Sequence, residues 1–256
     1  MTLPHQLERV VTIQADRQTV FRFFTDPARW AKWWGAGSTI DARPGGALLI
    51  RYPGGTEVLG DVVEVLVPER IVFTYGYASG KPIPPRSSRV TIRLEEDGAA
   101  TRLRFTHEFA DESVRDEHVQ GWRFQLSLFA NVVLDEVHAG AAGAVDGWFS
   151  AWAESDASRR QQALTRVSAP DVRFRDRFSL IDGVDDLTAH VGAAQRFMPG
   201  IRMERRGDVR HCQGTVLADW IWVTPGGDER ARGTNVFSFR PDGLIESVIG
   251  FMTTAR

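Results

Sequence analysis

Residues 232–252 read RGTNVFSFRPDGLIESVIGFM, and this stretch predicts two β-strands joined at the turn Pro241-Asp242-Gly243. β-branched and aromatic residues fill both runs, and an Asp-Gly step between such runs is typical of a hairpin. Asn235 lies among the apolar residues of the first run. The stretch therefore predicts an antiparallel sheet that carries an amide within apolar surroundings.

A carboxylate lies in similar surroundings earlier in the chain. Val172 and Phe174 alternate with charged residues until Asp176 closes the run, which is the alternation of a strand. A carboxylate and an amide in apolar, β-rich segments are typical of a small concave pocket, and proton transfer uses these two residue types. The pattern predicts a site without naming a substrate.

Helices precede the strands in this half of the chain. Apolar residues recur at helical spacing in three segments. One short run with strand character precedes the third segment, and four such runs follow it. The helices are expected near 145–152, 163–167 and 187–198, and the strands near 171–176, 201–210, 213–224, 230–240 and 244–252. Helices followed by an antiparallel sheet predict the α+β class.

The first half has its own complete set of elements. A strand near 7–13 and two short helices come first, then a series of strands, and a long helix near 112–137 closes the set. The strands are expected near 46–52, 56–67, 70–77, 87–95 and 101–109. The small residues of 139–143 mark a boundary, so we expect two α+β domains, 1–137 and 143–256, each a bent antiparallel sheet around helices.

Composition narrows the classes of function. The chain has 256 residues, 43% hydrophobic and 25% charged, with a formal net charge of −2. That balance argues against nucleic acid or an anionic membrane as the main partner. The beginning of the chain lacks the pattern of a signal peptide, and no apolar run approaches membrane-spanning length. We therefore expect a cytoplasmic protein.

The sequence offers little for a metal or a covalent nucleophile. The six histidines are dispersed, and Cys212 is the only cysteine, which excludes a cysteine-based zinc cluster and an internal disulfide. Serines such as Ser150 and Ser238 lack the surroundings of a nucleophile. We expect neither a metal nor a cofactor.

Three residues are candidates for acid/base chemistry, and each has a structural alternative. Asp176 is a candidate general base, but it could instead pair with one of the neighbouring arginines, Arg173, Arg175 and Arg177. His190, at the edge of an apolar helical stripe, is either a proton shuttle or a buried histidine. Asn235 either donates to a ligand oxygen or satisfies strand backbone.

Aromatic residues are candidates for the walls of a ligand site. Trp220 and Trp222 share one face of a strand by their spacing, and this face is either a pocket wall or hydrophobic core. In the first half, His107 ends a strand just before the long helix that holds Trp122. The candidate ligand-binding residues are Trp148, Trp152, Trp220, Trp222, Phe237, His107 and Trp122.

Short motifs in the first half resemble those of bacterial proteins similar to the activator of the large heat-shock ATPase, within the START-like helix-grip superfamily. The resemblance covers about 5–137 and implies a helix-grip fold with a cavity between its sheet and long helix. It rests on Phe21 and Phe24 before Thr25-Asp26-Pro27, Trp33-Trp34, Pro44-Gly45-Gly46, Gly60-Asp61-Val62, Pro68-Glu69-Arg70, Val90 to Leu94, Thr101-Arg102-Leu103 and Gly121-Trp122.

The second half resembles a SnoaL-like domain of the nuclear transport factor two-like superfamily. The resemblance covers about 143–256 and implies a cone-shaped α+β barrel, a fold that hosts polyketide cyclases, ketosteroid isomerases, dehydratases and non-catalytic binders. It rests on Trp148, Trp152, Asp156, the run Asp171 to Asp176, Gly183, Asp219-Trp220, and Arg232-Gly233 through Asp242-Gly243-Leu244-Ile245.

The ketosteroid isomerases of that superfamily allow a comparison by residue. Their catalytic aspartate corresponds to Asp176, and a protonated aspartate that donates to the oxyanion corresponds to Asn235. Their donor tyrosine corresponds to Trp148, whose indole N–H can donate one hydrogen bond but is not acidic. The resemblance thus implies a pocket with an acid/base group and departs from the isomerases at one donor.

Three functions remain open from the sequence. The first is a bacterial small-molecule pocket protein with cyclase-, isomerase- or hydrolase-like acid/base chemistry on a hydrophobic or polyketide-like substrate in the second domain. The second is non-catalytic carriage of a hydrophobic ligand. The third is a co-chaperone-like interaction role, implied only by the first resemblance. Domains resembling the second half often pair through their sheets, so we also expect a homodimer.

Overall fold

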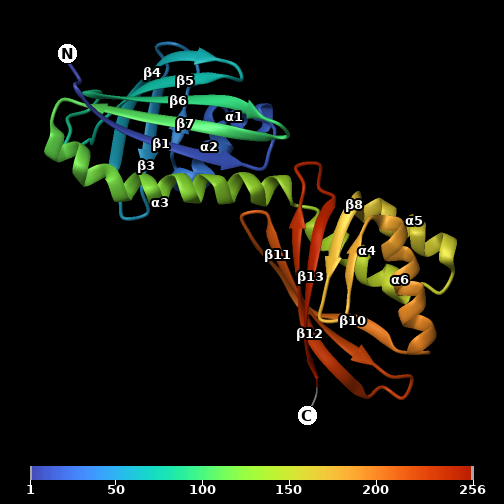
Figure 1. The fold of residues 1–256 in the computed structure, drawn as a ribbon. Coiled ribbons are helices and arrows are strands. Elements are labelled where there is room, and N and C mark those ends of the chain that lie inside the picture. The colour runs from blue at the N-terminus through green and yellow to red at the C-terminus, as the bar shows by residue number, and fades with distance from the viewer. Residues whose placement is uncertain (1, 255–256) are drawn as a thin grey trace. The chain divides into compact units, whose positions relative to one another are not determined.

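The structure, a computed structural model, describes residues 2–254. The chain forms two compact units, an N-terminal unit of residues 1–134 and a C-terminal unit of residues 135–256. Six helices and two sheets make up the described part (Figure 1). The predicted α+β class is confirmed.

The N-terminal unit is a seven-stranded antiparallel sheet combined with helices (Figure 1). Along the sheet the strand order is β1-β7-β6-β5-β4-β3-β2, a meander in which the first strand joins the last. The elements are β1 (His5–Ile13), α1 (Arg17–Thr25), α2 (Pro27–Trp34), β2 (Thr39–Ile40), β3 (Ala47–Arg51), β4 (Glu57–Leu66), β5 (Arg70–Tyr75), β6 (Ser88–Asp97), β7 (Ala100–Phe109) and α3 (Glu112–Val137).

Two aspartates begin the short helices of this unit. The Asp16 side chain accepts a hydrogen bond from the Thr19 backbone N–H, and Asp26 accepts from the N–H groups of Ala28 and Arg29. Both are N-caps that satisfy otherwise free backbone donors. Pro27 occupies the first turn of α2, where its missing N–H carries no penalty.

The core of the N-terminal unit lies between the sheet and α3. The stripe predicted on the long helix is buried: Trp122 is 3% exposed, Leu126 3%, Phe129 1% and Val133 0%. Phe129 stacks on Phe24 at 4.7 Å between ring centroids. Steps of four, three and four residues separate these side chains, and this helical spacing correctly predicted which face of α3 is buried.

The C-terminal unit is a six-stranded mixed sheet with its three helices against one face (Figure 1). The strand order is β10-β11-β12-β13-β8-β9. The elements are α4 (Ala141–Ala153), α5 (Ala157–Val167), β8 (Ser168–Arg175), β9 (Leu180–Asp182), α6 (Val184–Phe197), β10 (Arg202–Cys212), β11 (Thr215–Val223), β12 (Glu229–Phe239) and β13 (Ile245–Thr254).

One strand pair departs from the predicted antiparallel arrangement. β13 pairs with β8 in parallel, whereas the other pairs of this sheet are antiparallel. The chain passes through α6 and four further strands between β8 and β13, so no tight turn fixes their relative direction. The short β9 was also not expected from the sequence.

The predicted hairpin of residues 232–252 is present. The Arg240 backbone N–H donates to the Leu244 carbonyl at 2.9 Å, and Gly243 has a φ of +83°, which glycine adopts without strain. The register that follows places Asn235 opposite Gly250. This pairing sets the geometry of the site described below.

Among the described residues, no single helix is long and apolar enough to cross a membrane, although the consecutive helices α3 and α4 pass that test of length and hydropathy together.

Candidate functional site

A cavity of about 140 Å³ lies on the helix-covered face of the C-terminal sheet. Most of its wall is aromatic or methionine, and three of the four methionines of the chain contribute to it. The apolar wall consists of Trp152, Phe174, Phe178, Met198, Met203, Trp220, Trp222 and Met252, and the polar groups are Asp176, Arg177, Ser179, His190 and Asn235. Methionine beside aromatic rings gives an apolar wall that adapts to the shape of a ligand.

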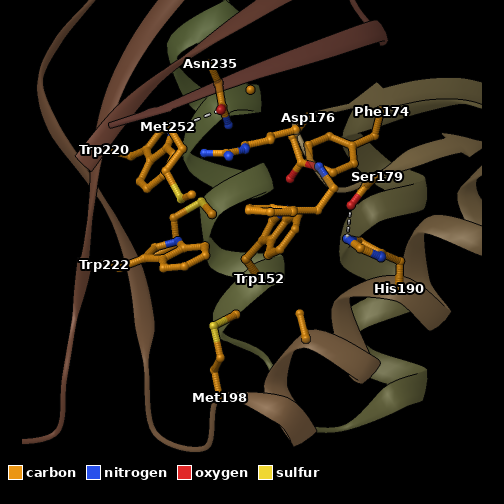
Figure 2. A pocket seen from close by; sticks show the side chains of 15 residues that line it. Trp152, Phe174, Asp176, Ser179, His190, Met198, Trp220, Trp222, Asn235 and Met252 are labelled. Atoms are coloured by element: carbon orange, nitrogen blue, oxygen red, sulfur yellow. Dashed lines mark hydrogen bonds between the residues drawn. The ribbon is translucent and has the colours of Figure 1, made fainter. Parts of the chain in front are cut away.

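Asn235 projects into this cavity from β12 with a fixed orientation (Figure 2). Its side chain is 3% exposed, and its Oδ1 accepts a hydrogen bond of 2.9 Å from the Trp220 indole Nε1. An indole N–H can only donate, so the atom that faces Trp220 must be the amide oxygen. The amide nitrogen has no hydrogen-bond partner within residues 2–254 and is available to a ligand oxygen.

Asp176 lines the same cavity from the turn after β8 (Figure 2). Its Oδ1 accepts a hydrogen bond of 2.8 Å from the Phe178 backbone N–H, and its own backbone N–H donates to the Ser179 carbonyl. These bonds hold the half-buried carboxylate in place and leave Oδ2 without a partner among residues 2–254.

Asp176 does not form the ion pair with a neighbouring arginine that was the structural alternative to a catalytic role, as far as residues 2–254 show. Within residues 2–254, Asp176 takes part in none of the ion pairs, and the nearby Arg175 lies 4.0 Å from Asp182 instead. Arg177 extends over the Phe178 ring, with its guanidinium carbon 5.6 Å from the ring centroid. The carboxylate therefore forms no ion pair with a neighbouring arginine among the described residues.

Gly250 allows the two polar groups to approach each other. A Cβ added at this glycine would lie 3.2 Å from the Asn235 Oδ1 and 3.3 Å from the Asp176 Cβ. Both are tighter than ordinary van der Waals contact, so the missing side chain keeps the floor of the cavity open between them. Asp176 and Asn235 consequently lie on the same side of the sheet and border the same space.

His190 comes to the cavity from α6. Its Nε2 lies 3.3 Å from the Ser179 Oγ, and its ring contacts Trp152 and Phe174 with centroids 6.0 and 5.8 Å apart. The imidazole is half-buried. It adds a third group capable of proton transfer to the wall that carries Asp176.

The predicted aromatic residues divide into wall and core. Trp152, Trp220 and Trp222 line the cavity, whereas Trp148 and Phe237 are fully buried and do not. The Trp148 ring packs against Phe237 at 5.9 Å, and its indole N–H has no hydrogen-bond partner in the part of the chain that the structure describes. The structure thus places Trp148 in the core beside the cavity, not at the position of a donor to a ligand.

His107 is also a core residue, in the N-terminal unit. Its Nδ1 accepts from the Trp122 indole N–H at 2.9 Å, so its Nε2 carries the proton and donates to the Ser88 Oγ at 2.8 Å. Burial, with a smaller effect of His118, holds the pKa of His107 well below its ordinary value. The ring is therefore neutral and fully bonded, and it lies apart from the cavity that Trp122 lines.

Several wall residues were not identified from the sequence. Arg177, Phe178 and Ser179 belong to a loop without periodicity, and the methionines give no pattern of their own. Gly233 and Gly250 did carry a signal, because glycine inside a strand marks a close approach. At Gly233 an added Cβ would overlap the Trp220 ring, so this glycine makes room for the indole that orients Asn235.

No metal site accompanies these groups. Among the residues that the structure describes, no three histidine, cysteine, aspartate or glutamate side chains are grouped to hold an ion.

Comparison with known proteins finds one matching family model for each part of the chain. Residues 14–133 match the family described as Activator of Hsp90 ATPase homolog 1-like protein, and residues 145–248 match the SnoaL-like domain. None of the curated proteins matches the chain.

Solved structures match one half of the chain at a time. A proposed isomerase of the SnoaL-like family from Agrobacterium tumefaciens is 27% identical, with 46% of this chain and 98% of that chain covered and a TM-score of 0.43. CalU16 from Micromonospora echinospora is also 27% identical, with 49% and 75% covered and a TM-score of 0.41. The Aha1 dimer from Colwellia psychrerythraea is 19% identical, with 48% and 92% covered and a TM-score of 0.42.

The chain is thus an α+β protein of two units, in which a region matching the Activator of Hsp90 ATPase homolog 1-like family precedes a region matching the SnoaL-like domain family.

Proposed function

We propose that the C-terminal unit binds a small apolar molecule bearing a carbonyl group and moves a proton on it. One observation carries the proposal: Trp220 fixes the Asn235 amide so that its N–H donors face the cavity, where the Asp176 carboxylate also lies without an arginine partner. A donor for oxygen beside a free carboxylate is the minimum set for removing a proton next to a carbonyl.

In the proposed reaction the ligand oxygen accepts a hydrogen bond from the Asn235 Nδ2. The Asp176 carboxylate removes a proton from the adjacent carbon, and the negative charge that develops on oxygen is stabilised by the amide N–H. The tryptophan and methionine wall limits competing water, which strengthens the effect of a preorganised donor. His190 supplies a further group able to return the proton to the ligand or to exchange it with solvent.

The size of the cavity restricts the substrate. An apolar cavity of about 150 Å³ holds a benzene molecule, and this one measures about 140 Å³. A single ring, or one ring of a larger molecule whose remainder lies outside, fits this space. We therefore propose a cyclase- or isomerase-like reaction class on a ring-sized apolar ketone, within the broader hydrophobic or polyketide-like class expected from the sequence.

The test uses cyclohexanone as the probe and follows exchange of its α-protons with solvent deuterium by NMR. Asp176→Asn should lower the exchange rate by at least about a hundredfold, the usual contribution of a general base. The affinity for cyclohexanone should change by less than about tenfold, or about 1.4 kcal/mol, because the substitution keeps the shape of the side chain.

Asp182→Asn is the matched control, since Asp182 is an exposed carboxylate on β9 that does not line the cavity. It should leave both exchange and affinity unchanged. Exchange that survives Asp176→Asn at the wild-type rate would contradict the proposal. Binding without any exchange in the wild type would favour non-catalytic carriage.

We also propose that the protein is a homodimer that pairs through the C-terminal sheet. Ile249 and Phe251 are two residues apart on β13, so they share one face of the sheet, and they are 43% and 60% exposed. These two exposed apolar side chains are the observation that supports pairing through this face. Sedimentation at micromolar concentration should give twice the mass of the 28.6 kDa chain, and a monomer would contradict this arrangement.

A further inference from the structure

A second cavity, of about 550 Å³, lies in the N-terminal unit. The chain contains three tyrosines, and all of them line it. Tyr52 follows β3, Tyr75 ends β5, and Tyr77 comes two residues later, while His118 and Trp122 reach the cavity from α3. We propose that this cavity, referred to below as the tyrosine cavity, binds a neutral aromatic molecule through a hydroxyl group that the ligand donates.

The hydrogen bonds in the tyrosine cavity have a defined direction at His118. The Nδ1 atom lies 2.7 Å from the Val114 carbonyl, which can only accept, so Nδ1 carries the proton. In the neutral ring Nε2 is then an acceptor, and the Tyr77 hydroxyl at 3.1 Å must donate to it. The proton of Tyr77 is consequently committed, whereas its oxygen remains able to accept.

The other two tyrosines also retain accepting capacity. The hydroxyl groups of Tyr52 and Tyr75 lie 3.1 Å apart and share one hydrogen bond. A hydroxyl oxygen has two lone pairs, and this bond uses one lone pair of one of the two atoms. One hydroxyl of this pair donates and the other keeps its own proton, so the cavity presents several oxygen acceptors and one further O–H. A ligand hydroxyl, which both donates and accepts, satisfies more of these groups than a ligand with acceptors alone.

The buried lining of the tyrosine cavity is uncharged near neutral pH. Burial raises the pKa of Tyr52 to about 12 and raises that of Tyr75 well above its ordinary value, while burial lowers the pKa of His118. Lys81 and Glu117, the charged lining residues, are exposed. A carboxylate held against the buried residues of the wall would lose its hydration without a cation among them, because Lys81 is exposed. A neutral ligand is therefore favoured.

Aromatic side chains define the rest of the ligand class. The Tyr75 ring contacts Trp122 and Tyr77 with centroids 6.1 and 5.8 Å apart. Rings in such edge and tilted arrangements accept a further ring among them. A volume of about 550 Å³ is within the usual range for ligand sites and admits more than one ring. The class is thus a neutral phenol or naphthol.

The test compares three bicyclic probes against the full-length protein by calorimetry at neutral pH. 2-Naphthol carries a neutral hydroxyl, 2-methoxynaphthalene lacks the proton, and 2-naphthoate carries a charge. We expect 2-naphthol to bind at least about fivefold more tightly than either of the others, as one hydrogen bond gained or lost would give. Equal or tighter binding of the ether or the carboxylate, or no binding of 2-naphthol, would overturn the proposal.

Variants locate the binding. Tyr77→Phe should weaken 2-naphthol by about fivefold and leave 2-methoxynaphthalene unchanged, because only the phenol uses that oxygen. Ser127→Ala, which removes an exposed hydroxyl of α3, and Asn235→Ala, in the other unit, should change neither affinity. A loss of 2-naphthol binding in Asn235→Ala would move the site to the C-terminal unit and overturn the assignment. Should Tyr77→Phe fail to fold, the affinities of the three probes for the wild type still test whether a neutral hydroxyl group on the ligand determines binding.

Discussion

At the scale of single residues, the candidate site depends on two N–H groups that can donate a hydrogen bond but cannot accept one. The Trp220 indole can only donate, which fixes Asn235, and the Phe178 backbone N–H fixes one oxygen of Asp176. The remaining amide N–H groups and carboxylate oxygen are then free within residues 2–254. One atom of each side chain is held by a hydrogen bond while the other faces the apolar cavity, so the Asn235 amide and the Asp176 carboxylate are not free to rotate.

Gly250→Ala tests the close approach of these two groups. The new methyl would press on Asn235 and Asp176 at 3.2 and 3.3 Å, so we expect the proton-exchange rate with cyclohexanone to fall by about tenfold, the scale of a small misplacement. The free energy of unfolding should change by less than about 1 kcal/mol, because neighbours need to move only slightly.

Gly143→Ala is the matched control for that substitution. A Cβ at Gly143 in α4 meets no atom within 4 Å, and alanine is the better helix former. It should leave the exchange rate unchanged and raise the midpoint of urea unfolding. Equal rates in Gly250→Ala and the wild type would show that the floor of the cavity does not position the reacting groups.

At the scale of secondary-structure elements, periodicity predicted the inner faces and the turn chemistry predicted the hairpin. The stripe on α3 and the Asp242-Gly243 turn are both present as expected. The parallel pairing of β13 with β8 and the short β9 were not expected, because they depend on tertiary packing and not on local pattern. The residues of the candidate site also differ in whether a local sequence pattern predicted them. A polar residue within an apolar strand stood out at Asn235, whereas the loop residues Arg177 to Ser179 carried no periodic signal.

The buried histidine of β7 gives a prediction about pH. The pKa of His107 is depressed in the folded protein, so the unfolded chain binds more protons at mildly acidic pH. Stability contributed by the neutral ring is present above the ordinary histidine pKa and is lost as the pH falls below about 6.5. We expect the midpoint of urea unfolding, followed by tryptophan fluorescence, to fall between pH 7.5 and pH 5.5.

His107→Gln isolates this contribution, because glutamine can accept from Trp122 and donate to Ser88 but does not titrate. Its midpoint should depend less on pH over the same interval than that of the wild type. His118 and His138, whose pKa values burial also lowers, account for a remaining dependence. A wild-type midpoint that is constant or rises on acidification would contradict the neutral assignment of His107.

At the scale of the whole molecule, two cavities of different chemistry occur in one chain. The C-terminal cavity is small and combines a carboxylate with an amide donor, whereas the tyrosine cavity is larger and presents uncharged oxygen acceptors. The first is suited to proton transfer and the second to recognition of a hydroxyl group. We therefore propose separate ligands for the two units, and each proposal can fail without the other.

The central claim is that Asp176 and Asn235 act on one ligand in one step. The most direct measurement is the cyclohexanone proton-exchange rate in four proteins: the wild type, Asp176→Asn, Asn235→Ala and the double variant. Groups that serve the same transition state give losses that do not multiply. We expect Asn235→Ala to lose about a hundredfold, as for removal of an oxyanion donor, and the double variant to be no slower than Asp176→Asn alone. A double variant whose loss equals the product of the two single losses, or single variants that exchange at the wild-type rate, would contradict the account.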